Sequence, residues 1–160
     1  NGGGMVVVNR EQRRRLAEGG DVSLDGANSG DVSLEGASFS ECTAGIDGGG
    51  MFVYIYRRRY VRVQQRRRRA GDSGDVSLDG ASFSECTAGI DGGGMFVYNS
   101  GDVSLDGASF SECTAPDGGG MHVWYSGDVS LERASFVRCT SGVQAALYLL
   151  GIDRLALTNS

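Results

Sequence analysis

The stretch GDVSLEGASFSECTAGIDGGGMFVY, from Gly30 to Tyr54, decides the fold because the chain repeats it almost unchanged. It returns from Gly74 to Tyr98 with a single change, Glu35 to Asp79, and edited versions follow at intervals of 27 and 26 residues. A constant period of this length is typical of a solenoid, in which each unit buries its apolar face only by stacking on the next.

Short apolar alternations within each unit predict strands, because alternate side chains of a strand point to opposite faces. The connectors EG or DG, AGID or APD, and SG have the composition of turns. In the first unit the inward residues are Val32 and Leu34, Ala37 and Phe39, and Met51 and Val53. GDVSL itself begins at Gly20, Gly30, Gly74, Gly101 and Gly127. We therefore predict an all-β fold, a right-handed parallel β-helix of about five coils with three short strands per coil.

Equivalent residues of a β-helix form columns, because neighbouring coils stack about 4.8 Å apart. The sequence predicts two inside columns: Phe39, Phe83, Phe110 and Phe136, and Cys42, Cys86, Cys113 and Cys139. Stacked cysteines hold their Cβ atoms at about 4.8 Å, whereas a disulfide needs about 3.8 Å. No CxxC or histidine-bearing spacing indicates a metal site. We expect reduced, buried thiols that pack as small apolar groups.

Two motifs of the unit resemble those of a known repeat family. FSEC at Phe39–Cys42 and GGGM at Gly48–Met51 are similar to the paired FxxN and GGA(I/L/V) motifs of the chlamydial polymorphic outer-membrane protein repeat. That repeat is a right-handed β-helix related in shape to pectate lyases, and QAALYL at 144–149 and LALTNS at 155–160 resemble its less regular coils. Here Cys stands where the family has Asn, and Gly where it has Ala. The resemblance implies an extracellular or cell-surface passenger domain with a role in adhesion.

Two arginine-rich insertions, residues 9–19 and 55–73, interrupt the repeat at the same corner. We interpret residues 1–160 as a single β-helix domain, a piece of a longer solenoid, with both insertions leaving the stack as loops. The insertions hold 12 Arg against 3 acids, a net charge of +9, whereas the remainder carries −14. The overall charge of −5 therefore conceals a basic corner on an acidic column.

The second insertion is a candidate polyanion site that would bind phosphate, sulfated glycan or anionic lipid. Its clustered candidates are Arg57, Arg58, Arg59, Arg66, Arg67, Arg68 and Arg69. The alternative is a solvated loop that arose by low-complexity expansion, since the chain uses Arg 15 times and never Lys. Nucleic acid is not the partner that we expect, and no apolar stretch in the sequence is long enough to span a membrane as a helix.

Aromatic side chains are predicted to form two adjacent outward columns: Phe52, Phe96, His122 and Tyr148, and Tyr54, Tyr98 and Trp124. An exposed aromatic strip of this kind often marks a binding surface. Its aromatic faces suit the sugar rings of a glycan or another surface protein, and all these residues except Tyr148 are candidate ligand-binding residues. The alternative is that the inserted loops or a neighbouring domain cover the strip.

Acidic residues also form columns: Asp31, Asp75, Asp102 and Asp128, and Glu35, Asp79, Asp106 and Glu132. Calcium between neighbouring carboxylates would relieve their repulsion. Asp side chains in turns more often accept hydrogen bonds from their own turn amides, and the GGxGxD calcium pattern is absent. We therefore expect neither a cofactor nor a metal.

A catalytic site needs a unique constellation, whereas a repeat supplies the same residues at every level. The places where the repeat is broken are His122, Trp124, Arg133, Arg138 and Arg154, which belong to different strands. No nucleophile elbow, phosphate loop or zinc spacing is present. We predict a non-catalytic spacer and display domain. The alternative is a pectate-lyase-like helix that binds or cleaves polysaccharide as a lyase or glycoside hydrolase.

Overall fold

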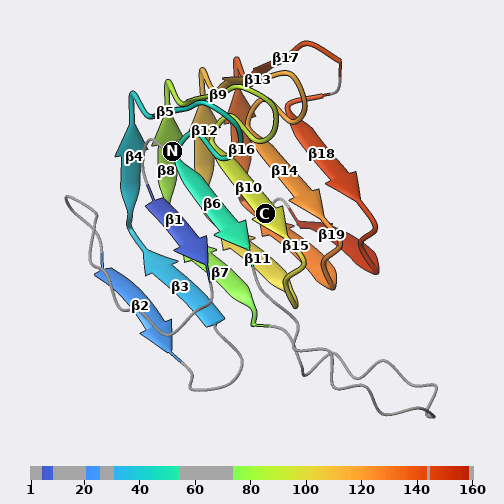
Figure 1. The fold of residues 1–160 in the computed structure, drawn as a ribbon. Helices are drawn as coiled ribbons and strands as arrows, with labels where there is room; N and C mark the ends of the chain where they lie inside the picture. Colours follow the sequence, from blue (N-terminus) through green and yellow to red (C-terminus); the bar gives the residue numbers. More distant parts are fainter. Residues whose placement is uncertain (1–4, 9–20, 26–30, 55–73, 144, 159–160) are drawn as a thin grey trace.

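The strands of this protein wind into a stack of similar coils (Figure 1). The computed structural model describes residues 5–8, 21–25, 31–54, 74–143 and 145–158. The first complete coil consists of β3 (Asp31–Glu35), β4 (Ser38–Ser40), β5 (Thr43–Ala44) and β6 (Met51–Tyr54). All described elements are strands, and the predicted parallel β-helix is confirmed.

Three further coils repeat this order. They are formed by β7 (Val76–Asp79), β8 (Ser82–Ser84), β9 (Thr87–Ala88) and β10 (Met95–Tyr98); by β11 (Val103–Asp106), β12 (Ser109–Ser111), β13 (Thr114–Ala115) and β14 (Met121–Trp124); and by β15 (Asp128–Glu132), β16 (Ser135–Val137), β17 (Thr140–Ser141) and β18 (Leu147–Leu150). β1 (Met5–Val8) and β2 (Asp21–Asp25) precede them, and β19 (Arg154–Thr158) follows.

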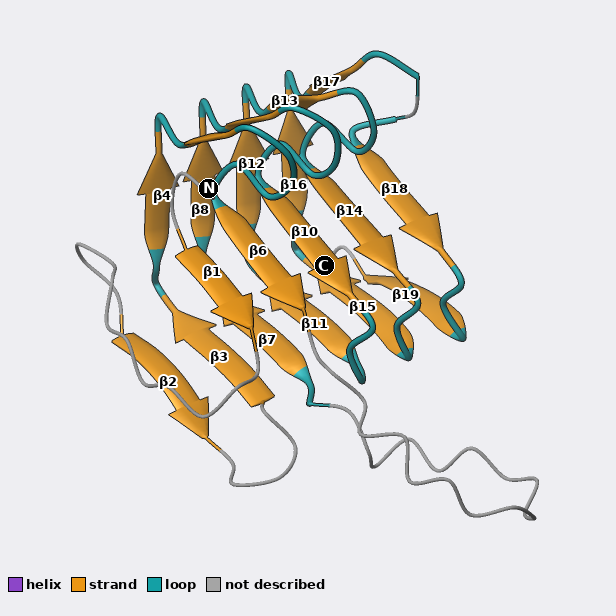
Figure 2. Cartoon of the chain, viewed as in Figure 1, coloured by secondary structure: helices purple, strands orange, loops and turns teal. Residues whose placement is uncertain are grey.

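Equivalent strands of successive coils pair into four sheets. Sheet A has the order β1-β6-β10-β14-β18 and sheet B the order β19-β15-β11-β7-β3-β2. Sheet C contains β16-β12-β8-β4, and sheet D contains β17-β13-β9-β5 (Figure 2). Pairing between coils is parallel and residue for residue, as in Met95 with Met51 and Val103 with Val76.

Each coil contains a fourth strand that the sequence did not predict. Thr43–Ala44 and its equivalents form the short strands of sheet D. A segment of two residues cannot display an apolar alternation, so it resembled part of a turn. The count of three strands per coil was therefore one too low.

The first repeat of GDVSL departs from the solenoid. β2 pairs with β3 in the antiparallel sense, with Asp21 opposite Glu35 and Asp25 opposite Asp31. Only residues 26–30 connect the two strands, whereas a parallel connection requires a dozen residues or more. The chain must therefore turn back on itself here, and the GDVSL that begins at Gly20 does not start a coil.

The core consists of the columns that the apolar alternation predicted. The rings of Phe83 and Phe110 stack with centroids 4.7 Å apart and planes 2° from parallel, and Phe39 and Phe136 extend the same stack. Val, Leu, Ala and Met columns line the rest of the interior. Stacking of identical residues lets every coil fill its neighbour's space in the same way.

The predicted cysteine column also lies inside. Cys86 and Cys113 are 0% exposed, Cys42 and Cys139 are half-buried, and all four are free thiols. The Sγ atom of Cys86 donates to the carbonyl oxygen of Phe39 in the preceding coil at 3.6 Å. Burial, together with the neighbouring Cys86 thiol, raises the pKa of the Cys42 thiol to about 11.

Candidate binding surface

The outer face of sheet A brings the predicted aromatic columns together. Phe52, Phe96, His122 and Tyr148 pair in register through β6, β10, β14 and β18. Tyr54, Tyr98 and Trp124 form the adjacent column of the same strands. We call these residues, together with Tyr125, the outer aromatic surface. The arrangement of the two columns is as expected, but their exposure is not.

The first column is largely buried, which corrects the expectation of an exposed strip. Phe96 is 4% exposed and His122 is 3% exposed, while Phe52 and Tyr148 are half-buried. The rings pack on one another, with centroids 5.5 Å apart for Phe52 and Phe96 and 4.6 Å apart for His122 and Tyr148. The preceding loop also closes on the column, since a Cβ at Gly118 would lie 3.0 Å from the Cβ of His122.

In the second column, the ring faces are turned toward each other. Tyr54 and Tyr98 stack with centroids 4.9 Å apart and an interplanar angle of 16°. In this stack each ring covers one face of its neighbour, and both side chains are half-buried. The face that Tyr54 and Tyr98 share is therefore closed to a sugar ring, and ligand binding by these two residues stays a prediction.

Trp124 ends this stack because its ring is turned. It lies at 90° to Tyr98 with centroids 5.5 Å apart. The Nε1 atom of Trp124 is buried and has no hydrogen-bond partner among the described residues. The indole is half-buried, so what it offers at the surface is ring area rather than its N–H group.

Tyr125 joins Trp124 on the surface and was missed by the sequence analysis. It is 51% exposed, and its ring centroid lies 5.5 Å from that of Trp124. Tyr125 has a positive φ of 55°. Its column neighbours Asn99 and Gly151 also have positive φ values, of 59° and 68°. The signal in the sequence is that WYSG replaces the YNSG of the preceding coil.

A row of aspartates accompanies the buried column and was also missed. Asp47, Asp91 and Asp117 precede each GGG segment, and Asp91 pairs with Asp117 across a parallel bridge. Nδ1 of His122 lies 3.1 Å from Oδ1 of Asp91, although the two atoms are not aligned for a hydrogen bond. Burial first, and the Asp91 carboxylate second, raise the pKa of Asp47 above its ordinary value.

The outer aspartate column is hydrogen-bonded from one coil to the next. Oδ1 of Asp31 accepts a hydrogen bond from the backbone N–H of Asp75 at 2.9 Å, and the same contact joins Asp75 to Asp102 and Asp102 to Asp128. The donors are amides of the next coil rather than of the same turn. Across the part of the chain that the structure describes, no group of three His, Cys, Asp or Glu side chains is arranged to hold a metal ion.

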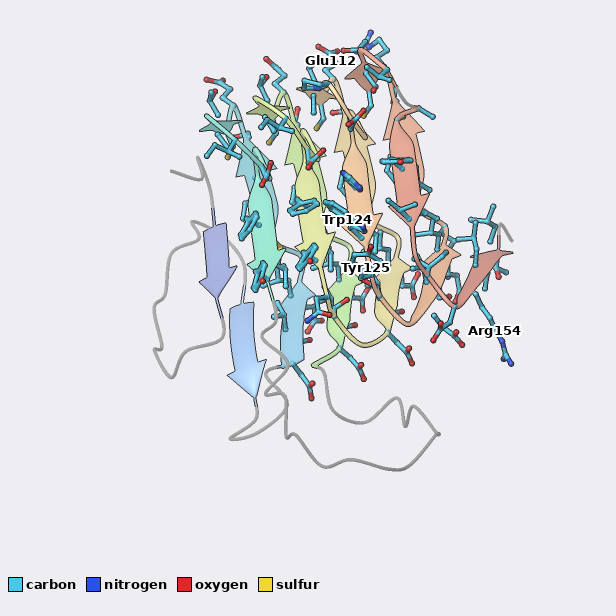
Figure 3. The ribbon with its side chains drawn as sticks, turned by 45° about the vertical axis from the view of Figure 1, so that its right-hand side comes forward. Glu112, Trp124, Tyr125 and Arg154 are labelled. Atoms are coloured by element: carbon cyan, nitrogen blue, oxygen red, sulfur yellow. The ribbon has the colours of Figure 1, made fainter. Side chains whose placement is uncertain are left out.

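The arginines that break the repeat pair with acids of the preceding coil. Arg133 forms an ion pair with Asp106, and Arg138 forms one with Glu112. Arg154 lies opposite Asp128 on sheet B. Figure 3 shows Glu112 and Arg154 well separated from Trp124 and Tyr125. These arginines therefore do not converge with His122 and Trp124 into one site.

The candidate polyanion residues Arg57, Arg58, Arg59, Arg66, Arg67, Arg68 and Arg69 lie outside the described residues, as does the insertion 9–19. Polyanion binding stays a prediction. No helix among the described residues has the length and apolar character needed to cross a membrane.

The resemblance to the chlamydial repeat rests on the FSEC and GGGM motifs. A comparison of the chain with family models, with curated proteins and with solved structures finds no match. The family stays a prediction, and function has to be argued from the surface that the β-helix carries.

Proposed function

We propose that this protein is a non-catalytic display domain, secreted or exposed at a cell surface, in which a rigid β-helix carries an adhesive surface. The observation that carries the proposal is the residue-for-residue pairing of β6, β10, β14 and β18. A binding surface built on paired strands is held in place more tightly than one built on loops.

The closed core supports the rigid part of this role. Val, Leu, Phe and Met columns run without interruption from β3 to β15, and the largest of these side chains are fully buried. Close packing of this kind resists bending because any bend must separate stacked side chains. Such a stack suits a spacer that holds its outer surface at a fixed place.

Two features support a role without catalysis. The exposed Arg133 and Arg138 form ion pairs with acidic side chains. The carboxylates of Asp31, Asp75 and Asp102 each accept a hydrogen bond from a backbone amide of the next coil. These groups form contacts between neighbouring coils and do not converge on one site. A reaction centre requires several groups that reach one substrate atom.

Polysaccharide cleavage is the second candidate, and one observation favours it. His122 and Asp91 form a carboxylate–imidazole pair, an arrangement that orients a general base in many enzymes. In this protein the pair is buried, and neither ring nitrogen of His122 is accessible from outside. A substrate would reach it only after the column had opened.

A glycan array tests the proposal. The whole chain and a variant that lacks residues 55–73 are applied at low and at high salt. Salt-resistant binding that survives the deletion is the expected result, because the outer aromatic surface does not depend on charge. Every bound glycan is then incubated with the protein and assayed for new reducing ends and unsaturated products.

If the protein is a display domain, it should bind the glycan without releasing cleavage products. Release of products that is lost in His122→Phe would overturn the non-catalytic proposal, since Phe stands at the same place in the two preceding coils. Absence of any glycan binding, with intact β-structure by circular dichroism, would reduce the proposal to a spacer without an adhesive surface.

A further inference from the structure

We propose that Trp124 and Tyr125 together form a stacking site for a sugar ring of an uncharged glycan. This inference rests on the proposed display function and deepens it, because it names the ligand class and restricts the site to the end of β14. Figure 3 shows the two side chains side by side at that place.

The first argument is ring orientation. Tyr54 and Tyr98 cover each other's faces, with an interplanar angle of 16°. Trp124 and Tyr125 are both turned away from that stack, at 90° and 76° to Tyr98, and lie within 28° of each other. They also stack on each other, with centroids 5.5 Å apart, so the ring area that they offer to a ligand lies outside that contact and is chiefly that of Tyr125, which is 51% exposed. The apolar C–H face of a sugar ring is flat and stacks on such a surface.

The second argument is backbone conformation. Tyr125 has a φ of 55°, which is unusual for a bulky side chain and unfavourable compared with Asn or Gly. Its column neighbours at this turn are Asn99 and Gly151, the residue types that accept a positive φ most readily. Tyr125 is 51% exposed, so burial offsets little of the strain. Exposed Glu and Arg residues carry similar strain at other corners of the coils, and what sets Tyr125 apart is that an aromatic ring replaces the Asn and Gly of its column.

The third argument is that the next coil makes room for the ring. A Cβ at Gly151 would lie 2.6 Å from Cδ1 of Tyr125, closer than real atoms approach. Glycine at 151 therefore lets the tyrosine ring lie against the backbone of the following coil. A ring that is held in place before binding loses less entropy when a ligand arrives.

The fourth argument is charge. Exposed Asp102 lies directly before β11 and exposed Asp128 begins β15, and Arg154 is the cation of that column among the described residues. These carboxylates would repel phosphate or sulfate groups, whereas the arginines of the insertion 55–73, which follows the equivalent strand β6 in the sequence, lie outside the described residues. An uncharged saccharide meets no such penalty, and its hydroxyl groups remain in water.

Fluorescence gives a direct test because Trp124 is the only tryptophan of the chain. The protein is titrated with neutral oligosaccharides of glucose, N-acetylglucosamine and mannose, and separately with heparin, at low and high salt. The expected result is a saturable change of Trp124 emission with at least one neutral oligosaccharide, unaffected by salt.

The repeat supplies a variant that removes one ring while keeping a native local sequence. Tyr125→Asn introduces the residue that Asn99 provides in the preceding coil, at the same positive φ. We expect it to weaken neutral oligosaccharide binding about tenfold, the scale of one lost aromatic stacking contact. Ser104→Ala is the matched control, because Ser104 lies on sheet B, where Ala156 already occupies the same column, and binding should not change.

Three outcomes would overturn this inference: no emission change with any neutral oligosaccharide, wild-type affinity in Tyr125→Asn, or a response to heparin alone that disappears at high salt. Array binding that persists in Tyr125→Asn would exclude this site and leave the display function intact. Product release with a preserved emission change would instead reject display and retain the stacking site.

Discussion

Strain at single residues recurs once per coil at the corner between sheets C and D. Glu41, Glu85, Glu112 and Arg138 have φ values between 52° and 54°. They occupy the left-handed region that costs most residues roughly 1–2 kcal/mol. The side chains point into solvent, and burial does not offset this cost. Each coil therefore carries a small, repeated destabilisation at the corner after its Phe column.

Glycine at this corner should relieve the strain. Glu85→Gly is expected to raise the free energy of unfolding by about 1 kcal/mol, because the gain at a positive φ exceeds the added flexibility of the unfolded chain. Urea unfolding followed by circular dichroism measures it. Glu35→Gly is the control. Glu35 ends a regular strand, so this variant should have a lower free energy of unfolding. A loss of stability in both variants would show that Glu85 is not strained.

Asp47 makes stability depend on pH. Burial and the Asp91 carboxylate raise the pKa of Asp47 in the folded protein. The folded state therefore binds the Asp47 proton more tightly than the unfolded state does. This contribution to stability is fully present below the unfolded pKa of about 3.9 and is lost as the pH rises through the folded pKa.

Asn at position 47 does not ionise, so Asp47→Asn should stabilise the protein at neutral pH. The advantage should shrink as the pH falls and should vanish below about 3.9. Urea unfolding of both proteins across this range provides the measurement. An advantage of equal size at neutral and acidic pH would mean that the ionisation of Asp47 is not its cause.

Among the elements, the glycine-rich loop before each sheet A strand tolerates the least change. A Cβ at Gly93 would lie 2.1 Å from the carbonyl oxygen of Gly119 in the next coil. Backbone atoms cannot move apart here without disturbing the coil spacing. The loops that precede β10 and β14 are therefore packed backbone against backbone.

Gly93→Ala is expected to destabilise the protein by about 3 kcal/mol or more, because a methyl group is forced into a closely packed contact. Gly45→Ala provides the matched control in the preceding coil: no atom lies within 4 Å of its Cβ position, and it should change stability little. Thermal and urea unfolding of both variants compare them. Equal stability of the two would contradict backbone packing at Gly93.

The elements also show how far the sequence could predict the structure. Strands with an inward alternation, such as β3 and β6, were predictable because burial sets a period of two. β5 was not, since its two residues carry no period. The direction of β2 depended on a short connection rather than on its own residues, which match those of β3.

The candidate site was predictable only in part for a similar reason. Register placed Phe96, His122 and Trp124 in their columns, as the sequence implied. Exposure and ring orientation depend on how neighbouring side chains fill space, which alternation does not encode. Tyr125 lies in a turn, where apolar alternation carries no signal, and the one indication of it in the sequence is that it replaces an asparagine in an otherwise repeated turn.

For the molecule as a whole, stability should grow coil by coil. Deletion of residues 74–100 joins residue 73 to Gly101, where the same GDVSL begins again. We expect the shortened chain to keep its β-structure and its urea m-value to fall by about a quarter, in proportion to the surface of one coil. Circular dichroism during urea unfolding measures both.

A deletion of half a coil, residues 74–87, is the control because it joins unlike parts of the repeat. That variant should lose cooperative unfolding. If the full-coil deletion unfolded equally poorly, the coils would not be interchangeable units.

Residue-for-residue pairing has a consequence for how such a chain can change over generations. A coil cannot distinguish a copied neighbour from the original, since both present the same residues in the same register. Unequal recombination between neighbouring stretches of the gene can therefore add or remove whole coils without requiring a new interface. Each event would change the length of the rod by about 4.8 Å while the Trp124 and Tyr125 surface is inherited intact. The length of the β-helix can therefore evolve separately from the surface that it carries.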